Sequence, residues 1–416
     1  MDWRKNCVMS KFEQFRVEFD AGTRCPSLML KFCLQTVFAI LLSMQIAGCM
    51  PRIHPAGERI YPGRLETDRY VTADDTVLPL RVWLPASGEV KAVLIALHGF
   101  NDYSNFFQLP GSYLQQQGIA SYTYDQRGFG GTPGRGLWAG VDTYGEDLRL
   151  FVQLIKARYP ELPVYVLGVS MGAAVTIAAL GRDADMPVDG VILVAPAVWA
   201  RSTMPWYQRF VLWSMAHTLP WLTLTGESVQ VMASDNIEML RAFSRDPLVI
   251  KETRVEAIYG LTNLMDAAAA SAANIEVKSL LLVGEKDEII PQEATFRFLQ
   301  NFLQTGTANK TVAFYQNGYH MLLRDCQAAV VWKDIAAWIA RADAALPSGA
   351  DRRAAELLRE NGLHRQLAMA AGAMACTERA GFATKSFSGC VFRDKKRTIK
   401  GQERRELHHL RFAVNK

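Results

Sequence analysis

Cysteine is scarce in the central part of this chain. Of the seven cysteines among 416 residues, only Cys326 lies between residues 60 and 345, so no internal disulfide can stabilise that part. The cysteines show neither the spacing of a metal site nor a paired disulfide framework, and the sequence contains no internal repeats. Because half of the residues are hydrophobic, we expect a globular fold stabilised by its core.

An excess of positive charge is also missing from most of the chain. The formal charge is +5, but residues 351–416 alone hold 15 Lys and Arg against 7 Asp and Glu. The remaining residues are slightly acidic, so we expect no nucleic acid among the partners. The tail, residues 348–416, begins with a helical pattern and ends in a basic stretch. We expect that stretch to be disordered, with binding to an anionic membrane surface as the alternative.

A hydrophobic run of membrane-spanning length is absent. The longest apolar stretch, Met29 to Ile46, contains polar residues and falls short of the roughly 20 mainly apolar residues that a spanning helix needs. Its lysine, short apolar centre and small residues are typical of a secretory signal. The ending Ile-Ala-Gly-Cys resembles the lipobox of bacterial lipoproteins, which implies a lipid on Cys49 and a membrane-anchored lipoprotein of the bacterial cell envelope, in the outer membrane or facing the periplasm. An uncleaved anchor and a buried helix are the alternatives.

Short, continuous apolar runs follow residue 60, and helical patterns lie between several of them. Runs without alternation suit strands buried on both faces of a parallel sheet, and their alternation with helices predicts a doubly wound, mostly parallel α/β sheet after an antiparallel opening. The predicted organisation is an N-terminal extension with the signal segment (1–49), a linker (50–59), an α/β domain (60–347) and the tail (348–416).

One serine lies where a buried strand gives way to a helix. Ser170 follows the strand that starts at Val164 and precedes an alanine-rich helix, with Gly168 and Gly172 on either side. A sharp strand-to-helix turn needs the backbone freedom and close approach that glycine allows. Such a turn exposes the serine at the carboxyl edge of the sheet, where α/β folds bind ligands. The pattern predicts the nucleophile elbow of an α/β-hydrolase.

A serine nucleophile needs a base, an acid that orients the base, and donors for the oxyanion. In this fold the acid and then the histidine follow the serine along the chain. We expect His320, after the last strand, to be the base and Asp287, after the preceding strand, to be the acid; the alternatives are a surface histidine and a solvated acidic loop. The expected oxyanion donors are the backbone amides of Met171 and Phe100. The side chain of His98 is expected to brace the loop that holds Phe100.

Five segments together resemble the monoacylglycerol lipase and lysophospholipase group of α/β-hydrolases. They are ALHGFNDYSNFF, YDQRGFGGT, GVSMGAA, LLVGEKDEIIP and YQNGYHMLLRD, in that order between residues 60 and 345. The resemblance implies the same triad of Ser170, Asp287 and His320 and the same two oxyanion amides. We expect the YDQRGFG turn, with Asp125 and Arg127, to brace the active-site face.

More than eighty residues separate the strand that ends near residue 196 from the strand that begins near residue 279. An insert of this length is far longer than an ordinary connection, so we expect a helical cap over about 197–275, inserted after the sixth strand. The family resemblance implies that this cap lines an acyl tunnel. Trp199, Trp206 and Tyr207 are the expected substrate contacts, and packing within the cap is the alternative role of its aromatics.

The sequence therefore predicts a serine hydrolase that cleaves a carboxylic ester of a lipid with a single acyl chain, either a monoacylglycerol or a lysophospholipid, through an acyl-enzyme intermediate. This chemistry requires no metal or cofactor. Acyl transfer and general carboxylesterase activity on the same triad are the enzymatic alternatives. A non-catalytic binding lipoprotein is the alternative of a different class.

Overall fold

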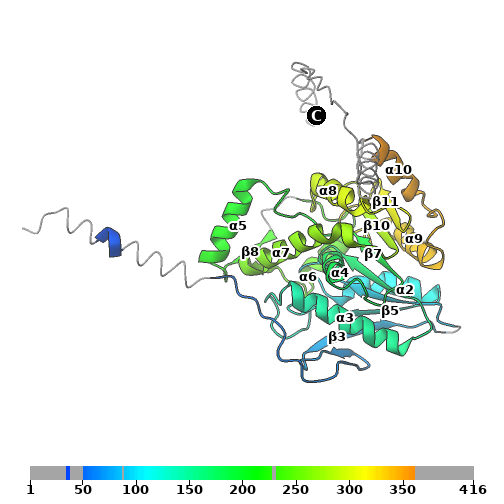
Figure 1. The fold of residues 1–416 in the computed structure, drawn as a ribbon, viewed down its shortest axis with the longest axis horizontal. Helices are drawn as coiled ribbons and strands as arrows, with labels where there is room; N and C mark the ends of the chain where they lie inside the picture. The colour runs from blue at the N-terminus through cyan, green and yellow to red at the C-terminus, as the bar shows by residue number, and fades with distance from the viewer. Residues whose placement is uncertain (1–33, 38–49, 87–88, 227–230, 361–416) are drawn as a thin grey trace, which may run out of the picture. The chain divides into compact units, whose positions relative to one another are not determined.

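The computed structural model describes residues 34–37, 50–86, 89–226 and 231–360 (Figure 1). A nine-stranded sheet lies at its centre, in the order β1-β2-β3-β5-β4-β6-β7-β10-β11. The strands are β1 (Arg64–Leu65), β2 (Arg69–Val71), β3 (Val77–Trp83), β4 (Ala92–Leu97), β5 (Ile119–Tyr124), β6 (Val164–Val169), β7 (Gly190–Val194), β10 (Ser279–Gly284) and β11 (Lys310–Tyr315).

The sheet begins antiparallel and becomes parallel, as the sequence patterns predict. The pairs from β1 to β3 and the pair of β3 with β5 are antiparallel, whereas all pairs from β5 to β11 are parallel. Every residue of β4, β5, β7 and β10 is buried. These continuous apolar runs are buried because helices cover both faces of the sheet. The parallel strands bring their carboxyl ends to one edge, which positions the loops that follow β6, β10 and β11.

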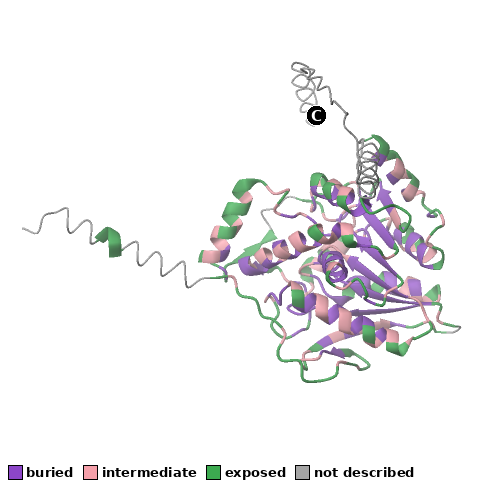
Figure 2. Cartoon of the chain, in the orientation of Figure 1, coloured by how far each residue is buried: buried purple, intermediate pink, exposed green. Residues whose placement is uncertain are grey.

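Two hydrophobic cores lie on opposite faces of the sheet. One core holds buried residues of α3 (Val141–Arg158), α4 (Met171–Arg182) and α8 (Gln292–Leu303), and the other holds buried residues of α2 (Gln108–Gln116) and α9 (Ala328–Ala340). Figure 2 shows the buried residues concentrated in the sheet and in the helix faces next to it.

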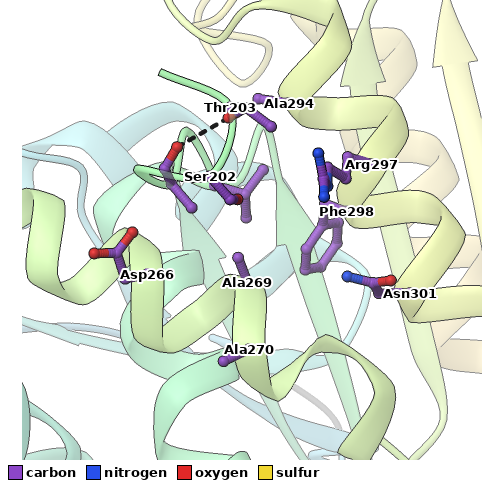
Figure 3. A pocket seen from close by; sticks show the side chains of 11 residues that line it. Ser202, Thr203, Asp266, Ala269, Ala270, Ala294, Arg297, Phe298 and Asn301 are labelled. Carbon is purple, nitrogen blue, oxygen red and sulfur yellow. Dashed lines mark hydrogen bonds between the residues drawn. The ribbon is translucent and has the colours of Figure 1, made fainter. Parts of the chain in front are cut away.

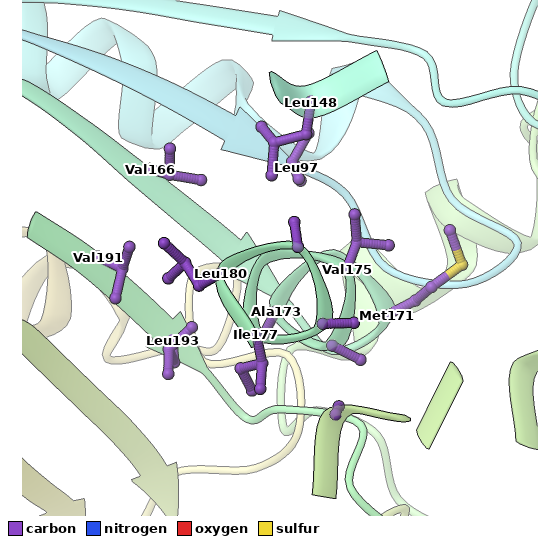
Figure 4. Packing of buried hydrophobic residues seen from close by; sticks show 14 of the residues in the cluster. Leu97, Leu148, Val166, Met171, Ala173, Val175, Ile177, Leu180, Val191 and Leu193 are labelled. Carbon is purple, nitrogen blue, oxygen red and sulfur yellow. The ribbon is translucent and has the colours of Figure 1, made fainter. Parts of the chain in front are cut away.

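Helix α4 is the most deeply buried of the helices around the candidate nucleophile. Its Ala173, Ile177 and Leu180 pack beside Val191 and Leu193 of β7, as Figure 4 shows. The small alanine side chains of α4 allow the helix axis to lie close to the sheet. Close packing against the sheet therefore fixes the position of the residues at the start of α4.

The insert after β7 holds helices and one small sheet, and its last helix buries Leu264 and Ala268 in the main core. It contains α5 (Trp206–Thr218), β8 (Thr223–Thr225), α6 (Ile237–Arg245), β9 (Glu252–Arg254) and α7 (Val255–Ser271). The antiparallel pairing of β8 with β9 is an addition to the predicted helical cap. The cap follows the seventh strand and not the sixth, because the two-residue strand β1 adds one to the predicted count.

Both ends of the predicted α/β domain need correction. Residues 50–59, predicted as a linker, are bonded to the domain, because the amide of His54 donates to the carbonyl oxygen of Trp138 at 2.8 Å and the amides of Ala56 and Gly57 also donate to domain side chains. At the other end, α10 (Ala350–Glu360) buries Ala354 and Leu358 in the core, and Arg353 forms an ion pair of 2.7 Å with Glu285. The boundary predicted at residue 347 is wrong, since the domain continues through α10.

Several sequence predictions fall outside the described residues. They are the lipidation of Cys49, most of the signal segment and the tail beyond residue 360. Within the part of the chain that the structure describes, no helix combines the length and the apolar composition needed to cross a membrane.

Candidate active site

Ser170 occupies a strained turn between β6 and α4. Its φ and ψ are 51° and −112°, a region that non-glycine residues adopt rarely and only where surrounding contacts hold them. The Ser170 amide donates to the Val194 carbonyl at 2.9 Å, and the Ser170 carbonyl accepts from the amides of Ala174 and Ala197, both at 3.1 Å. These bonds from α4 and from the strand next to β6 fix the turn.

The two glycines that flank the serine are required by close approaches of the backbone. A Cβ on Gly168 would lie 2.4 Å from the amide nitrogen of Ala173, and a Cβ on Gly172 would lie 2.4 Å from the carbonyl oxygen of Leu97. Both distances are far inside van der Waals contact. Both glycines of the Gly-x-Ser-x-Gly pattern are therefore needed for the close backbone packing of a nucleophile elbow.

His320 and Asp287 form a buried hydrogen-bonded pair. Nδ1 of His320 lies 2.8 Å from Oδ2 of Asp287, and each side chain is less than a tenth exposed. The other carboxylate oxygen of Asp287 accepts the amides of Ile289 at 2.8 Å and Ile290 at 3.0 Å. These bonds hold the carboxylate bent back toward the histidine, so Nδ1 carries the proton and Nε2 is left as an acceptor.

The loops that carry this pair touch each other at a second glycine pair. A Cβ on Gly284, at the end of β10, would lie 2.5 Å from the carbonyl oxygen of Gly318. The amide of Lys286 also donates to the Gly318 carbonyl at 2.9 Å. This close approach brings the turn that precedes Asp287 against the turn that precedes His320.

The structure places Ser170 at the same edge of the sheet but forms no bond between it and the pair. Ser170 follows β6, and Asp287 and His320 follow β10 and β11. No hydrogen bond between described residues joins the Ser170 hydroxyl to His320. Such bonds are often long without substrate and shorten in the substrate complex.

The two expected oxyanion donors lie on either side of the serine. Met171 is the first residue of α4, so its amide has no partner within the helix. Phe100 follows Gly99, where an added Cβ would lie 3.4 Å from the Cβ of Ser170. In the described part of the chain, neither of these two amides has a hydrogen-bond acceptor. Both are therefore available to an anion beside Ser170.

His98 is a structural brace and not a second base. It is fully buried, and its Nε2 accepts the amide of Gln126 at 2.9 Å. Nδ1 therefore carries the proton and donates to the Gly99 carbonyl at 2.8 Å. Burial lowers the pKa of His98, which favours the neutral ring. Two hydrogen bonds thus hold the turn that leads to Phe100.

The YDQRGFG turn is anchored by two buried side chains, in the bracing role expected for it. The guanidinium of Arg127 contacts the carboxylates of Asp74 and Asp147, each at 2.6 Å. The carboxylate of Asp125 accepts the amides of Ser104 and Gly131, both at 2.8 Å. These contacts join the turn to α3 and to the loop after β4.

Sequence reasoning missed the contacts that fasten the histidine loop. Oδ2 of Asp325 accepts the amide of Tyr319 at 2.8 Å, and its Oδ1 accepts the hydroxyl of the cap residue Ser234 at 2.6 Å. Burial raises the pKa of Asp325. Arg324 forms an ion pair with Asp102 of the loop after β4. The only sequence signal was an acid that closely follows the histidine in an apolar stretch.

The three cap aromatics expected to contact substrate lie in different surroundings. Trp199 is partly buried against the main core. Trp206 and Tyr207 are 71% and 53% exposed on α5, and their rings contact each other at 6.3 Å between centroids. No contact of the described residues brings Trp206 or Tyr207 to Ser170. The alternative role was packing within the cap; there the two rings contact each other but stay largely exposed.

A cavity of about 330 Å³ lies beside the cap but apart from the candidate catalytic residues. It is bounded by the loop after β7, α7 and α8, and Figure 3 shows Ser202, Asp266, Arg297 and Phe298 around it. Ser170, Asp287 and His320 are absent from its lining. No group of three potential metal ligands is present among the described residues.

The family comparison matches this chain over residues 88–327, more than half of its length, to the family described as serine aminopeptidase S33. Among curated proteins, the monoacylglycerol lipase of Mycolicibacterium smegmatis is 26% identical over 62% of this chain and 91% of that protein. The monoglyceride lipase of Rattus norvegicus is 25% identical over 61% and 83% of the two chains.

Solved structures show the same fold. The monoacylglycerol lipase of Paleococcus ferrophilus has a TM-score of 0.52 at 21% identity, covering 63% of this chain and 98% of that one. A soluble variant of the Saccharomyces cerevisiae monoglyceride lipase, in complex with a substrate analog, has a TM-score of 0.55 at 20% identity, covering 69% and 98%. The predictions of an α/β-hydrolase fold, of a resemblance to monoacylglycerol lipases and of a serine hydrolase are confirmed. The chain belongs to the serine aminopeptidase S33 family of α/β-hydrolases.

Proposed function

We propose that this enzyme hydrolyses the carboxylic ester of a lipid with one acyl chain, a monoacylglycerol or a lysophospholipid. The hydrogen-bonded pair of His320 and Asp287, at the same sheet edge as the strained Ser170, carries this proposal. The relatives named as monoacylglycerol lipases, one from a mammal and one from a bacterium, support the substrate class.

Ser170 is the nucleophile of the proposed reaction. Its Oγ attacks the ester carbonyl carbon while Nε2 of His320 accepts the hydroxyl proton. The carbonyl oxygen becomes negatively charged and accepts hydrogen bonds from the amides of Phe100 and Met171. The buried carboxylate of Asp287 stabilises the imidazolium that forms on His320.

The tetrahedral intermediate then collapses to an acyl-enzyme. The bond from the carbonyl carbon to the alcohol oxygen breaks, and His320 gives its proton to the departing alcohol, a glycerol or a glycerophosphodiester. A water molecule then attacks the acyl carbon as His320 takes one of its protons. The bond from the acyl carbon to Oγ of Ser170 then breaks, His320 returns the proton to Oγ, and the fatty acid leaves an unchanged enzyme.

Cleavage of an aminoacyl amide is the second candidate, because the family description names an aminopeptidase. The same triad would serve, but such an enzyme must also recognise a free α-amino group. The relatives named as monoacylglycerol lipases favour the lipid ester over the aminoacyl amide. Acyl transfer to an alcohol and general carboxylesterase activity are enzymatic alternatives that would use the same residues. A binding lipoprotein without catalytic activity is the alternative of a different class.

Specificity constants across a substrate panel test this proposal. The panel is monoacylglycerols of increasing chain length, lysophosphatidylcholine, a diacylglycerol, p-nitrophenyl acetate and an aminoacyl amide. We expect kcat/KM to rise with chain length, because each methylene buried in an apolar site contributes about 0.8 kcal/mol, roughly fourfold in equilibrium terms. A preference for acetate, or faster cleavage of the amide than of any acyl glycerol, would contradict the lipid assignment.

We also propose that Cys49 carries a lipid that anchors the enzyme in the cell envelope. The support is the sequence alone, a short apolar stretch followed by Ile-Ala-Gly-Cys. The mature chain should then begin at Cys49 and partition with membranes. Intact-mass measurement of the native protein tests this, and an unmodified Cys49 would contradict it.

A further inference from the structure

Asn101, the residue directly after Phe100, has a left-handed backbone. Its φ is 64°, and a residue other than glycine holds this conformation only at a cost in free energy that its surroundings must offset. Asparagine is enriched in this region among such residues. The bonds of His98 fix the turn before Phe100. The contacts that hold Asn101 therefore fix the turn after it.

Two hydrogen bonds join Asn101 to the cap. The amide of Ile250 donates to the Asn101 carbonyl at 3.0 Å, and Nδ2 of Asn101 donates to Oγ1 of Thr253 at 2.7 Å. Thr253 is buried in β9, which pairs with β8 and leads directly into α7. Because α7 buries Leu264 and Ala268 in the main core, the acceptor for the Asn101 side chain lies next to a firmly packed element. We call these two bonds the Asn101 tie.

The surroundings of the Asn101 tie leave little room for water. Phe100, Asn101, Ile250 and Thr253 are among the residues that line a cavity of about 10 Å³, which is about the volume that one water molecule needs. A water molecule is therefore a poor substitute for the Thr253 hydroxyl. The ring of Phe100 packs separately, 5.6 Å between centroids from the ring of Phe129. The side chain of Phe100 and the backbone that follows it thus have different partners.

We propose that Asn101 and Thr253 are positioning residues that aim the amide of Phe100 into the oxyanion hole. An oxyanion donor must lie about 2.7–3.1 Å from the developing charge. The peptide that carries this amide lies between Gly99 and Phe100, so rotation of the chain on either side of it moves the donor out of line. The Asn101 tie restricts rotation on the far side, as His98 does on the near side. Through Thr253 the cap acts on the chemical step.

This inference rests on the proposed mechanism at Ser170 and extends that mechanism to the cap. Asn101 and Thr253 act through the Phe100 amide, so their loss should weaken the bound transition state and leave binding of the uncharged ester nearly unchanged. A tie that only stabilises the fold would lower the melting temperature and leave kcat unchanged. Kinetics therefore separate the two roles.

Thr253→Val tests the tie, because valine has the shape of threonine without the hydroxyl. We expect kcat for p-nitrophenyl butyrate to fall by about 10- to 100-fold with KM nearly unchanged, less than the cost of about 10²–10³-fold for removing an oxyanion donor. Asn101→Gly, which keeps access to the left-handed backbone, should lose a similar factor, and the double variant little more. Thr253→Ser keeps the hydroxyl and should keep kcat within about twofold of the parent.

An alkyl trifluoromethyl ketone measures the oxyanion hole without turnover. Oγ of Ser170 adds to the carbonyl carbon, the hydroxyl proton passes to His320, and the carbonyl oxygen becomes an anion in the oxyanion hole. We expect the inhibition constant of this ketone for Thr253→Val to rise by the same factor as kcat falls. A primary alcohol of the same chain length forms no such anion, so its inhibition constant should not change.

Tyr103→Phe is the matched control within the same loop. The Tyr103 hydroxyl donates to Oδ2 of Asp246 at 2.7 Å, which is another bond between this loop and the cap, but Tyr103 lies three residues beyond Phe100. The control should lose stability like Thr253→Val yet keep kcat and binding of the ketone. Near-ultraviolet circular dichroism of each variant establishes that it is folded.

Equal falls of kcat in Tyr103→Phe and Thr253→Val would show that these bonds act only on the fold, and would overturn the proposal. An active parent whose Thr253→Val and Asn101→Gly variants both keep kcat would also overturn it, while leaving the proposed function intact. A parent that hydrolyses no ester would contradict the proposed function, and this inference with it.

Discussion

One carboxylate oxygen of Asp287 lies 2.8 Å from Nδ1 of His320, while its other oxygen accepts two backbone amides of the same turn. The acid is thus held by its own loop and has one oxygen free for the histidine. A side chain of the same shape could therefore keep the bonds to the loop, but only a carboxylate can also accept a hydrogen bond from Nδ1 of His320.

Replacement of Asp287 by asparagine should preserve the fold and nearly abolish activity. The asparagine amide would donate to Nδ1, which moves the proton to Nε2 and leaves no base for Ser170. We expect kcat to fall by about 10⁴-fold. The matched control is Glu288→Gln, whose side-chain oxygen still accepts the amide of Met232; it should retain activity. Loss of activity in the control but not in Asp287→Asn would reverse the assignment of the acid.

A methyl group on Gly172 should destabilise the elbow. The Cβ would lie 2.4 Å from the carbonyl oxygen of Leu97 in β4, so the strand or the helix must move. We expect Gly172→Ala to lower the free energy of unfolding by about 2–4 kcal/mol. Gly226→Ala, where no atom lies within 4 Å of the added Cβ, is the control and should change little. Denaturant unfolding measures both, and equal stabilities would show that the elbow is not tightly packed.

Stability should fall as the pH drops below the ordinary pKa of histidine, in part because of His98. Its pKa is lowered by burial, so below about pH 6.5 the unfolded chain binds a proton that the folded chain does not. Stability from this group is present at neutral pH and is lost on acidification, at about 1.4 kcal/mol per pH unit between the two pKa values.

The variant His98→Gln should be less stable at pH 7.5 yet show a shallower dependence between pH 6.5 and the lowered pKa. Chemical unfolding at several pH values measures this difference. A variant with the same slope as the parent would show that His98 remains exposed to protonation in the fold.

Helix α10 should contribute to stability, whereas the chain beyond it should not. Ala354 and Leu358 are buried against the core, and Arg353 pairs with Glu285 in the loop before Asp287. We expect Leu358→Ala to cost about 2–3 kcal/mol and deletion of residues 361–416 to leave the melting temperature nearly unchanged. The control is Leu357→Ala, one position away and only partly buried, which should cost less. Equal losses for Leu357 and Leu358 would contradict the packing of α10.

The features that sequence reasoning found are those set by local patterns. A buried strand followed by the Gly-x-Ser-x-Gly pattern and an alanine-rich helix predicts one kind of turn. Because parallel strands end at the same edge of the sheet, the loops that carry Asp287 and His320 could also be placed at that edge. The sequence places the end of the domain before α10, because the last helix expected to pack on the sheet is complete by about residue 345. Only Ala350, Ala354 and Leu358, four residues apart, form its buried stripe, and this stripe is too short to stand out in the sequence.

The cap was harder to predict because its contacts are between distant segments. Composition and the family resemblance identify an aromatic insert near the catalytic edge, but they do not show which side of α5 faces outward. The pairing of β8 with β9 and the bond from Ser234 to Asp325 join residues far apart in the chain. No local pattern predicts such partners.

Labelling with a fluorophosphonate probe tests the central claim most directly, because the probe reacts only with a serine that a base has activated. Peptide mapping by mass spectrometry should find the adduct on Ser170, and His320→Gln should slow labelling by several orders of magnitude while leaving the fold intact. An unlabelled parent, an adduct on another serine, or a Ser170→Ala variant that hydrolyses esters at the parent rate would contradict the account.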